Sequence, residues 1–216
     1  MDTALQAENR QRFDRIAADW DDSPMRQGMA AAVAAAILAA VPVQPHWRAL
    51  EYGCGTGLVG ARIAPQLAEL TACDLSAGML AVLQQKADAA GLTHLHTRVL
   101  DLTTQPPPPE RHDLIFSSMT LHHIPDVPAL LKVFHGMLAP GGYVALADLD
   151  AEDGSFHGPD IPGVAHHGFD RQQFKRWLDE AGFADIALRT AHTVEKERAG
   201  QIVRYPVLLF SARRPA

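Results

Sequence analysis

One short stretch, residues 49–57, constrains the fold more than any other part of the chain. It reads Ala-Leu-Glu-Tyr-Gly-Cys-Gly-Thr-Gly, so an apolar run from Trp47 to Tyr52 meets three alternating glycines, and a segment of helical period begins at Leu58. A strand, a glycine turn and a helix form a βα unit, in which the missing Cβ atoms let the backbone approach a small ligand. The start of the helix then presents N–H groups and the positive end of its dipole. The sequence therefore predicts a ligand-binding turn over residues 53–57.

The glycines alone leave two ligand classes open. Gly55, Gly57 and Gly60 match the GxGxxG pattern of dinucleotide-binding proteins. The alternative register starts at Gly53, with Glu51 two residues earlier. This second register resembles motif I of the class I S-adenosylmethionine-dependent methyltransferases.

Two acidic residues follow the next two expected strands. Residues 70–74 read as a strand that ends in Asp74, about 20 residues after the glycines, where a carboxylate accepts hydrogen bonds from ribose hydroxyls. Residues 95–100 read as a third strand, followed by Asp101 and Leu102, which suit the amine and a ring nitrogen of adenine. Asp101 taken singly is equally well explained as a polar residue after a strand. The order of glycine turn, first acid and second acid favours the methyltransferase interpretation, because a nicotinamide-binding protein has no general need for the second acid.

Later segments extend the resemblance over roughly residues 10–150. The sequences DLIFSSMTLHHIPD, from Asp113, and LAPGGYVALAD, from Leu138, resemble the later motifs of the same family, especially its small-molecule branch often called type 11. The resemblance implies S-adenosyl-L-methionine as cofactor. The cofactor-binding residues that it implies are Glu51, Gly53, Gly55, Gly57, Asp74, Met79, Asp101, Leu102, Ser117 and Met119.

Histidines provide the candidates for a general base. His122, His123 and the pair His166 and His167 are candidates because the ordinary pKa of a histidine lies near neutrality, although a His-His pair before proline is often structural in this family. The segment 148–169 breaks the βα rhythm and reads as a polar lid that faces the acceptor. Its side chains also raise the alternative of a divalent metal, but their spacing fits no fixed ligand pattern, so no metal site is predicted. The acidic and histidine residues concerned are Asp148, Asp150, Glu152, Asp153, His157, Asp160, His166 and His167.

Composition narrows the partners and the location. A net charge of −6 and a pI near 6.0 argue against a nucleic-acid backbone and favour a small-molecule acceptor. The N-terminus shows no signal-peptide pattern, and the apolar run 29–41 is too short to span a bilayer. Cys54 and Cys73 suggest a cytoplasmic protein and read as small buried residues, or as neighbours near the ligand. The oligomeric state, monomer or homodimer, stays open.

The expected architecture is a single doubly wound, Rossmann-like α/β domain of seven strands, with helices on both faces and an antiparallel last strand. Two helices, residues 4–20 and 25–41, precede the first strand and are expected to cap the cleft. The N-terminal cap is assigned to residues 1–45, the cofactor-binding core to 46–150, and an acceptor-side loop, helix and hairpin to 151–216. Within the last part, residues 194–200 read as an exposed connecting loop.

Three functions remain distinguishable by experiment. The leading one is in-line methyl transfer to a small or medium-sized organic acceptor, which predicts binding of S-adenosylhomocysteine. A nicotinamide-dependent oxidoreductase would bind NADH instead, but the sequence shows no Tyr-x-x-x-Lys pair. A non-catalytic cofactor-binding subunit would bind the cofactor and methylate no acceptor.

Overall fold

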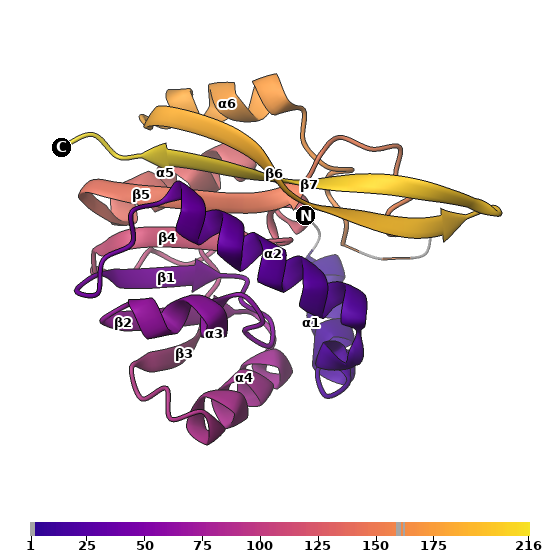
Figure 1. Ribbon diagram of the computed structural model, residues 1–216, viewed down its shortest axis with the longest axis horizontal. Helices are drawn as coiled ribbons and strands as arrows, with labels where there is room; N and C mark the ends of the chain where they lie inside the picture. Colours follow the sequence, from indigo (N-terminus) through magenta and orange to yellow (C-terminus); the bar gives the residue numbers. More distant parts are fainter. Residues whose placement is uncertain (1–2, 159–160, 162) are drawn as a thin grey trace.

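One seven-stranded sheet forms the centre of the protein (Figure 1). The computed structural model describes residues 3–158, 161 and 163–216, and the side chains from residue 8 onward. The strand order is β3-β2-β1-β4-β5-β7-β6, in which β1 to β5 are parallel and β7 is antiparallel to both neighbours. The predicted fold class is confirmed. The strands are β1 Arg48–Tyr52, β2 Glu69–Asp74, β3 Leu95–Val99, β4 His112–Ser118, β5 Leu138–Leu149, β6 Ala184–Arg198 and β7 Gln201–Arg213.

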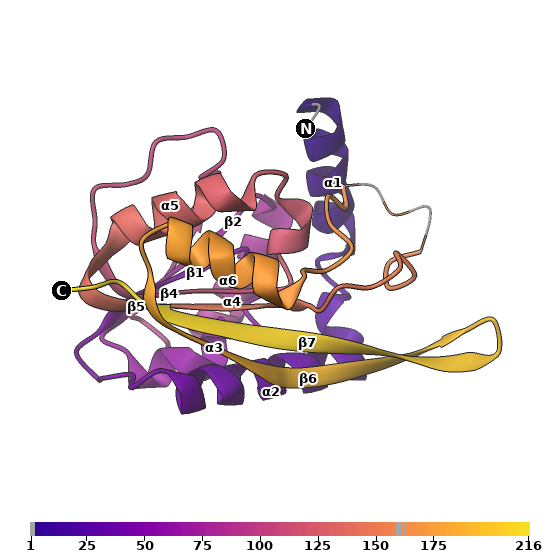
Figure 2. The same ribbon diagram turned by 90° about the horizontal axis from the view of Figure 1, so that it is seen from above.

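Helices cover both faces of the sheet (Figure 2). One face carries α2 (Pro24–Ala40), α3 (Gly60–Ile63) and α4 (Ala77–Ala89), and the other carries α5 (Val127–Met137) and α6 (Arg171–Glu180). Polar side chains begin several of these helices, as N-caps do: Ser76 accepts a hydrogen bond from the Met79 N–H at 3.1 Å, for example. The helix α1 (Thr3–Ile16) lies at the carboxyl edge of the strands. Among the described helices, none is long and apolar enough to cross a membrane.

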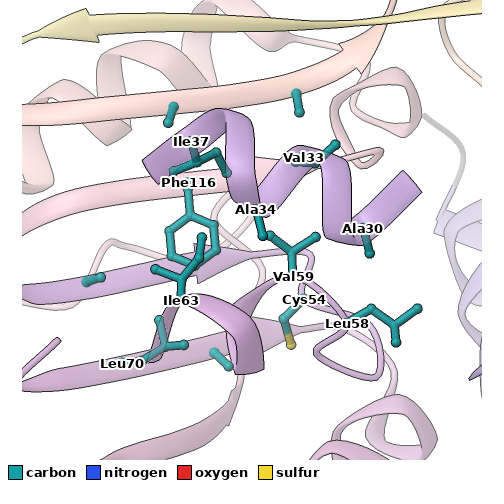
Figure 3. Packing of buried hydrophobic residues seen from close by; sticks show 14 of the residues in the cluster. Ala30, Val33, Ala34, Ile37, Cys54, Leu58, Val59, Ile63, Leu70 and Phe116 are labelled. Atoms are coloured by element: carbon teal, nitrogen blue, oxygen red, sulfur yellow. The ribbon is translucent and has the colours of Figure 1, made fainter. Parts of the chain in front are cut away.

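The core is divided by the sheet into two layers. Side chains of the parallel strands alternate between the faces, so that Phe116 belongs to one layer and Ile115 to the other. In the first layer Ile37 of α2 lies beside Phe116, which in turn lies beside Ile63 (Figure 3). Burial on both faces explains why these strands read as continuous apolar runs.

The C-terminal hairpin is longer than the sequence indicated. The expected loop 194–200 is wrong, because β6 continues to Arg198 and pairs it with Gln201 across a two-residue turn. The turn residues Ala199 and Gly200 have φ of 49° and 79°, as tight hairpin turns require. The charged residues of this segment led to the loop prediction. Their charges nevertheless alternate in sign from Glu195 to Arg198, which is the period of two of a strand.

Three further boundaries differ from expectation. The crossover helix expected over 58–67 is only four residues long and continues as a 3-10 turn at Ala64–Gln66, since Pro65 cannot donate a helical hydrogen bond. The leading helix ends at Ile16, and a separate 3-10 turn spans Trp20–Asp22. The expected turn before strand five is a bulge inside β5, where residues 139–142 lie between two pairings with β4.

Candidate functional site

A cavity of about 400 Å³ lies at the carboxyl ends of the central strands, enclosed by α1, α2, the loop after β5 and the hairpin. Such a crevice is where ligands bind in open α/β sheets. It brings together nine of the predicted site residues: Glu51, Gly53, Gly55, Asp74, Met79, Asp101, Met119, His122 and His123. Three others, Gly57, Leu102 and Ser117, are not among the lining residues that the structure describes.

The three glycines of the turn serve different purposes. All have positive φ, at 71°, 53° and 76° for Gly53, Gly55 and Gly57. A Cβ on Gly53 would lie 2.2 Å from the Thr120 hydroxyl, and one on Gly57 would lie 2.2 Å from a methyl group of Leu83. A Cβ on Gly55 would meet nothing within 4 Å. Gly55 is therefore the glycine that leaves the cavity open, while the other two permit close packing.

Asp74 holds the glycine turn in place. Its Oδ2 accepts a hydrogen bond from the Gly55 N–H at 2.8 Å, and its Oδ1 accepts one from the Ser76 N–H, also at 2.8 Å. Burial raises the pKa of this carboxyl, while the backbone N–H groups of Ser76 and Gly55 oppose the rise. Each carboxylate oxygen keeps one lone pair, so Asp74 can accept further hydrogen bonds from a ligand.

Glu51 is the most deeply buried acid of the cavity, with 2% of its surface exposed. Its Oε1 accepts a hydrogen bond from the Gly60 N–H at 3.2 Å, whereas the buried Oε2 has no partner among the described residues. A Cβ on Gly60 would lie 2.0 Å from Oε2, so the last glycine of the GxGxxG pattern makes room for this carboxyl. Burial raises the pKa of Glu51 to about 8. A buried carboxyl oxygen without a partner, in a residue that lines the cavity, indicates a missing polar partner.

Asp101 reaches the same cavity as Asp74 but is held by its own loop. Its Oδ1 accepts hydrogen bonds from the Thr103 N–H and hydroxyl at 2.9 and 2.6 Å, and its Oδ2 accepts one from the Thr104 hydroxyl at 2.8 Å. The side chain of Leu102 is buried in the core, and the Ser117 hydroxyl donates to the Tyr52 carbonyl at 2.7 Å. Leu102 and Ser117 therefore support the site from behind.

The backbone after β4 is bent toward the cavity at Met119. This residue has a φ of 55°, a left-handed conformation that is uncommon for a residue with a side chain. Its N–H donates to the Ala147 carbonyl at 2.8 Å, which fixes the conformation against β5. Strain of this kind is concentrated at functional sites.

Two aspartates fasten the N-terminal segment over the cavity. Asp14 Oδ1 accepts hydrogen bonds from the Ser76 hydroxyl at 2.6 Å and the Gly78 N–H at 2.9 Å. Asp21 accepts one from the Thr56 hydroxyl and forms an ion pair with Lys86, both at 2.5 Å. The segment therefore contacts both the glycine turn and α4.

The same segment places two aromatic rings on the wall of the cavity. Phe13 and Trp20 both line it, and their ring centroids lie 5.7 Å apart in an edge-to-face arrangement. The aromatic spacing of the leading helix in the sequence was the available signal for this covering role.

A buried chain of Asp148, His122 and His157 borders the far end of the cavity. His122 is 1% exposed, its Nδ1 lies 2.7 Å from Asp148 Oδ1, and its Nε2 lies 3.1 Å from Nε2 of His157. Burial alone would raise the pKa of Asp148, but the charge and hydrogen bonds of His122 hold it below its ordinary value. Burial, with repulsion from His122 and His123, lowers the pKa of His157 to about 3.

The two histidines predicted from the sequence therefore differ in position. Both ring nitrogens of His122 are engaged, so a ligand meets His157 first. His123 Nδ1 donates to the Gly163 carbonyl at 2.7 Å, and burial lowers the pKa of its ring to about 4. His157 carried only a weak signal in the sequence, as one of several polar residues in the segment 148–169.

Within the described part of the chain, no group of three or more His, Cys, Asp or Glu side chains is arranged to hold a metal ion. Cys54 and Cys73 are both buried free thiols. Asp160, one of the acidic residues noted in the sequence, lies outside the described residues.

Comparison with known proteins points to one family. A family model described as a methyltransferase domain matches residues 1–188. Phosphoethanolamine N-methyltransferase 1 of Arabidopsis thaliana is 28% identical over 148 residues, which make up 67% of this chain and 30% of that protein. The chain spans less than half the length of the first curated relatives that it matches.

Solved structures share the fold. The DhpI–SAH complex superimposes with a TM-score of 0.76 at 22% identity and covers 100% of this chain and 99% of the other. Phosphoethanolamine N-methyltransferase 2 of Haemonchus contortus, in complex with S-adenosyl-L-methionine, gives a TM-score of 0.70 at 20% identity and covers 85% of this chain and 52% of the other.

Proposed function

Because this chain belongs to the class I S-adenosylmethionine-dependent methyltransferases, we propose that it methylates a small organic acceptor bound between the glycine turn and the buried histidine chain. One observation carries the proposal: the glycine turn, both strand-end acids and the histidines line a single cavity of about 400 Å³. A cavity of this size and depth suits small ligands rather than a macromolecular surface.

The cofactor fits the half of the cavity formed by β1, β2 and β3. S-adenosyl-L-methionine supplies a methyl group already activated on a sulfonium. The open backbone at Gly55 admits its methionine part, and the unpartnered Oε2 of Glu51 is suited to its amino group, directly or through water. Asp74 and Asp101 are the proposed acceptors for the ribose hydroxyls and the adenine amine.

The chain's own contribution to the reaction is positioning and desolvation. Phe13 and Trp20 form an apolar wall that excludes water from the cavity. The contacts of Asp14 and Asp21 hold this wall against the core, so that less conformational entropy is lost when the acceptor binds.

Where the acceptor carries a proton, His157 is the proposed base. When His122 carries one proton, Asp148 holds that proton on Nδ1, and the hydrogen bond between the two Nε2 atoms then requires the proton of His157 on its Nε2. This arrangement leaves the lone pair of His157 on Nδ1. Because the pKa of His157 is low, a proton taken at its Nδ1 is accompanied by transfer of its Nε2 proton to Nε2 of His122, and the positive charge then lies on His122 beside Asp148. In this scheme His122 is the final proton acceptor, and Asp148 is a positioning residue.

The test is a binding and turnover experiment on the whole chain. Calorimetry with S-adenosylhomocysteine should show micromolar binding, and a screen with isotopically labelled S-adenosylmethionine should label one class among amine, hydroxyl, thiol and acidic small molecules. Absence of binding at millimolar S-adenosylhomocysteine would refute the assignment of the cavity. Tight binding without labelling of any acceptor would instead support a non-catalytic cofactor-binding protein.

A further inference from the structure

The charged residues of the cavity are separated by sign. Among the described lining residues, the acid Glu51 lies in β1, Asp74 ends β2, and Asp101 follows β3. The cations come from other elements, α1, α2 and β6. These cations are Arg10, Arg12, Arg26, Lys196 and Arg198. The strand ends of the cavity therefore suit a cationic cofactor, while the helices α1 and α2 and the hairpin strand β6 contribute positive charge.

The hairpin delivers two of these cations by strand alternation. In β6 the half-buried Lys196 and Arg198 share the inner face with buried Val194, whereas Glu195 and Glu197 are exposed on the outer face. Because successive side chains of a strand point to opposite faces, the sequence VEKER sorts its cations inward and its acids outward. The net charge of the protein is −6, so the cations that face the cavity do not reflect a general excess of basic residues.

The inward cations contact neutral groups. Lys196 Nζ donates to the Phe156 carbonyl at 2.8 Å and lies 3.4 Å from the centroid of the Phe156 ring. Arg198 donates to the carbonyls of Ser155 and Phe156 at 2.7 and 2.8 Å. Arg26 donates to the Trp20 carbonyl at 3.1 Å. The ion pairs between described residues involve none of these three cations.

The cations are also close enough to repel one another. Burial, with the charges of Arg198 and Arg26, lowers the pKa of Lys196 to about 8. Burial, with the charge of Arg12, lowers the pKa of Arg26. The charges of Glu152 and Asp21 oppose these shifts at Lys196 and Arg26, respectively, but neither carboxylate forms an ion pair with the cation. Repulsion among partly desolvated cations destabilises the unliganded protein, and a bound anion would relieve that repulsion.

We propose that the methyl acceptor carries an anionic oxygen group, phosphate, phosphonate or carboxylate, and that Lys196 and Arg198 bind it with the help of Arg26. This inference rests on the proposed function and adds the chemical class of the acceptor. The carbonyls that hold the two hairpin cations belong to Ser155 and Phe156, next to His157 in the chain. The anionic group and the proposed base are thereby placed at the same end of the cavity.

The experiment measures anion binding by the whole chain, cofactor-free and saturated with S-adenosylhomocysteine, by calorimetry. The probes are inorganic phosphate and acetate at constant ionic strength. The wild type should bind one of them saturably, and Lys196→Gln should weaken that binding at least tenfold. Lys196→Arg, which keeps the charge, should stay within about threefold of the wild type. Tighter binding of phosphate indicates a phosphate or phosphonate acceptor, and tighter binding of acetate indicates a carboxylate.

The matched control is Arg204→Gln. Arg204 lies on the neighbouring strand β7 and pairs with the outward Glu195 at 2.9 Å, so its removal changes the charge of the hairpin but not of the cavity. It should leave anion affinity unchanged. Equal anion affinity in the wild type and Lys196→Gln would overturn the inference, as would no saturable binding of either probe in either form.

The affinity for S-adenosylhomocysteine separates this inference from the proposed function. A tenfold loss of that affinity in Lys196→Gln, with anion binding unchanged, would assign the cation to the cofactor's carboxylate and overturn the inference. Failure of the wild type to bind S-adenosylhomocysteine would refute the proposed function, while anion binding by the cofactor-free protein would still report on the cation site.

Discussion

Replacing Glu51 with glutamine is expected to stabilise the cofactor-free protein, and more so at neutral than at acidic pH. Glu51 is 2% exposed, and burial raises its pKa from 4.5 to about 8. A carboxyl whose pKa is raised on folding holds its proton in the folded state after the unfolded chain has lost it. Stability is therefore lost as the pH rises from about 4.5 toward 8, which is opposite to the usual behaviour of a paired carboxylate.

The size of the effect follows from the two pKa values. With 4.5 for the unfolded chain and about 8 for the folded one, single-site linkage gives a cost of about 0.8 kcal/mol at pH 5 and about 3.3 kcal/mol at pH 7. Glutamine does not titrate, so the stability gap between the variant and the wild type should widen by about 2.5 kcal/mol. In a domain of this size that corresponds to roughly 5–10 °C in Tm.

The assay is thermal unfolding of the wild type and Glu51→Gln at pH 5, 6 and 7, without cofactor. Glu195→Gln, on the exposed face of β6, controls for the change in net charge. The difference in unfolding stability between each variant and the wild type at one pH cancels the contributions of the other titrating groups. A gap between Glu51→Gln and the wild type that stays constant from pH 5 to pH 7 would refute the reasoning.

The same substitution should weaken cofactor binding. Glu51 lines the cavity, its buried Oε2 has no partner among the described residues, and the proposed partner of this carboxyl is the cofactor's amino group. Loss of that charged contact is expected to lower the affinity for S-adenosylhomocysteine about tenfold, in line with hydrogen bonds to charged groups. Glu51 would then lower the stability of the cofactor-free protein and raise its affinity for the cofactor, which is a trade-off between stability and function. Unchanged affinity would show that Glu51 acts only on the glycine turn.

Three further substitutions test other parts of the site. For an acceptor that loses a proton, Asp148→Asn should slow methyl transfer by roughly 10²–10⁴-fold in a turnover assay. The affinity for S-adenosylhomocysteine, measured by calorimetry, should stay within twofold of the wild type. An unchanged rate would exclude the histidine chain from catalysis. Asp21→Asn should raise the Kd for S-adenosylhomocysteine roughly fivefold and speed proteolysis of the first 22 residues, whereas Asp22→Asn, at an exposed neighbour, should do neither. Gly53→Ala should cost roughly 1–3 kcal/mol more in denaturant unfolding than Gly200→Ala, because both have positive φ but only the first would place a Cβ 2.2 Å from another side chain; equal costs would contradict the packing argument.

The sequence was sufficient for the parts of the site that lie at strand ends. The glycine turn, Asp74 and Asp101 each follow an apolar run, and the carboxyl ends of parallel strands meet at one edge of a sheet. Local signals such as turn glycines, strand-length apolar runs and N-caps therefore determined both the fold and the part of the cavity that the strand ends line. The family motifs fixed their order along the chain.

The hairpin shows where local signals fail. The stretch VEKER has the composition of an exposed loop, yet it is a strand that pairs with β7. Its period of two is visible in the sequence, but which face is inward depends on the pairing register and on the packing of β6 against α2. The composition of this stretch predicted a loop, which is wrong. The pairing of β6 within the sheet is what turns Lys196 and Arg198 toward the cavity.

What the sequence determined by itself is the Rossmann-like core and the list of acids and glycines along its carboxyl edge, because each of these follows from a short-range pattern. The tertiary structure alone decided the other half of the cavity. It brought Lys196 near Arg26, placed His157 against His122, and fastened Asp21 to Thr56. The residues of these pairs are 35 to 170 positions apart in the chain, and no local period encodes which of them will face one another.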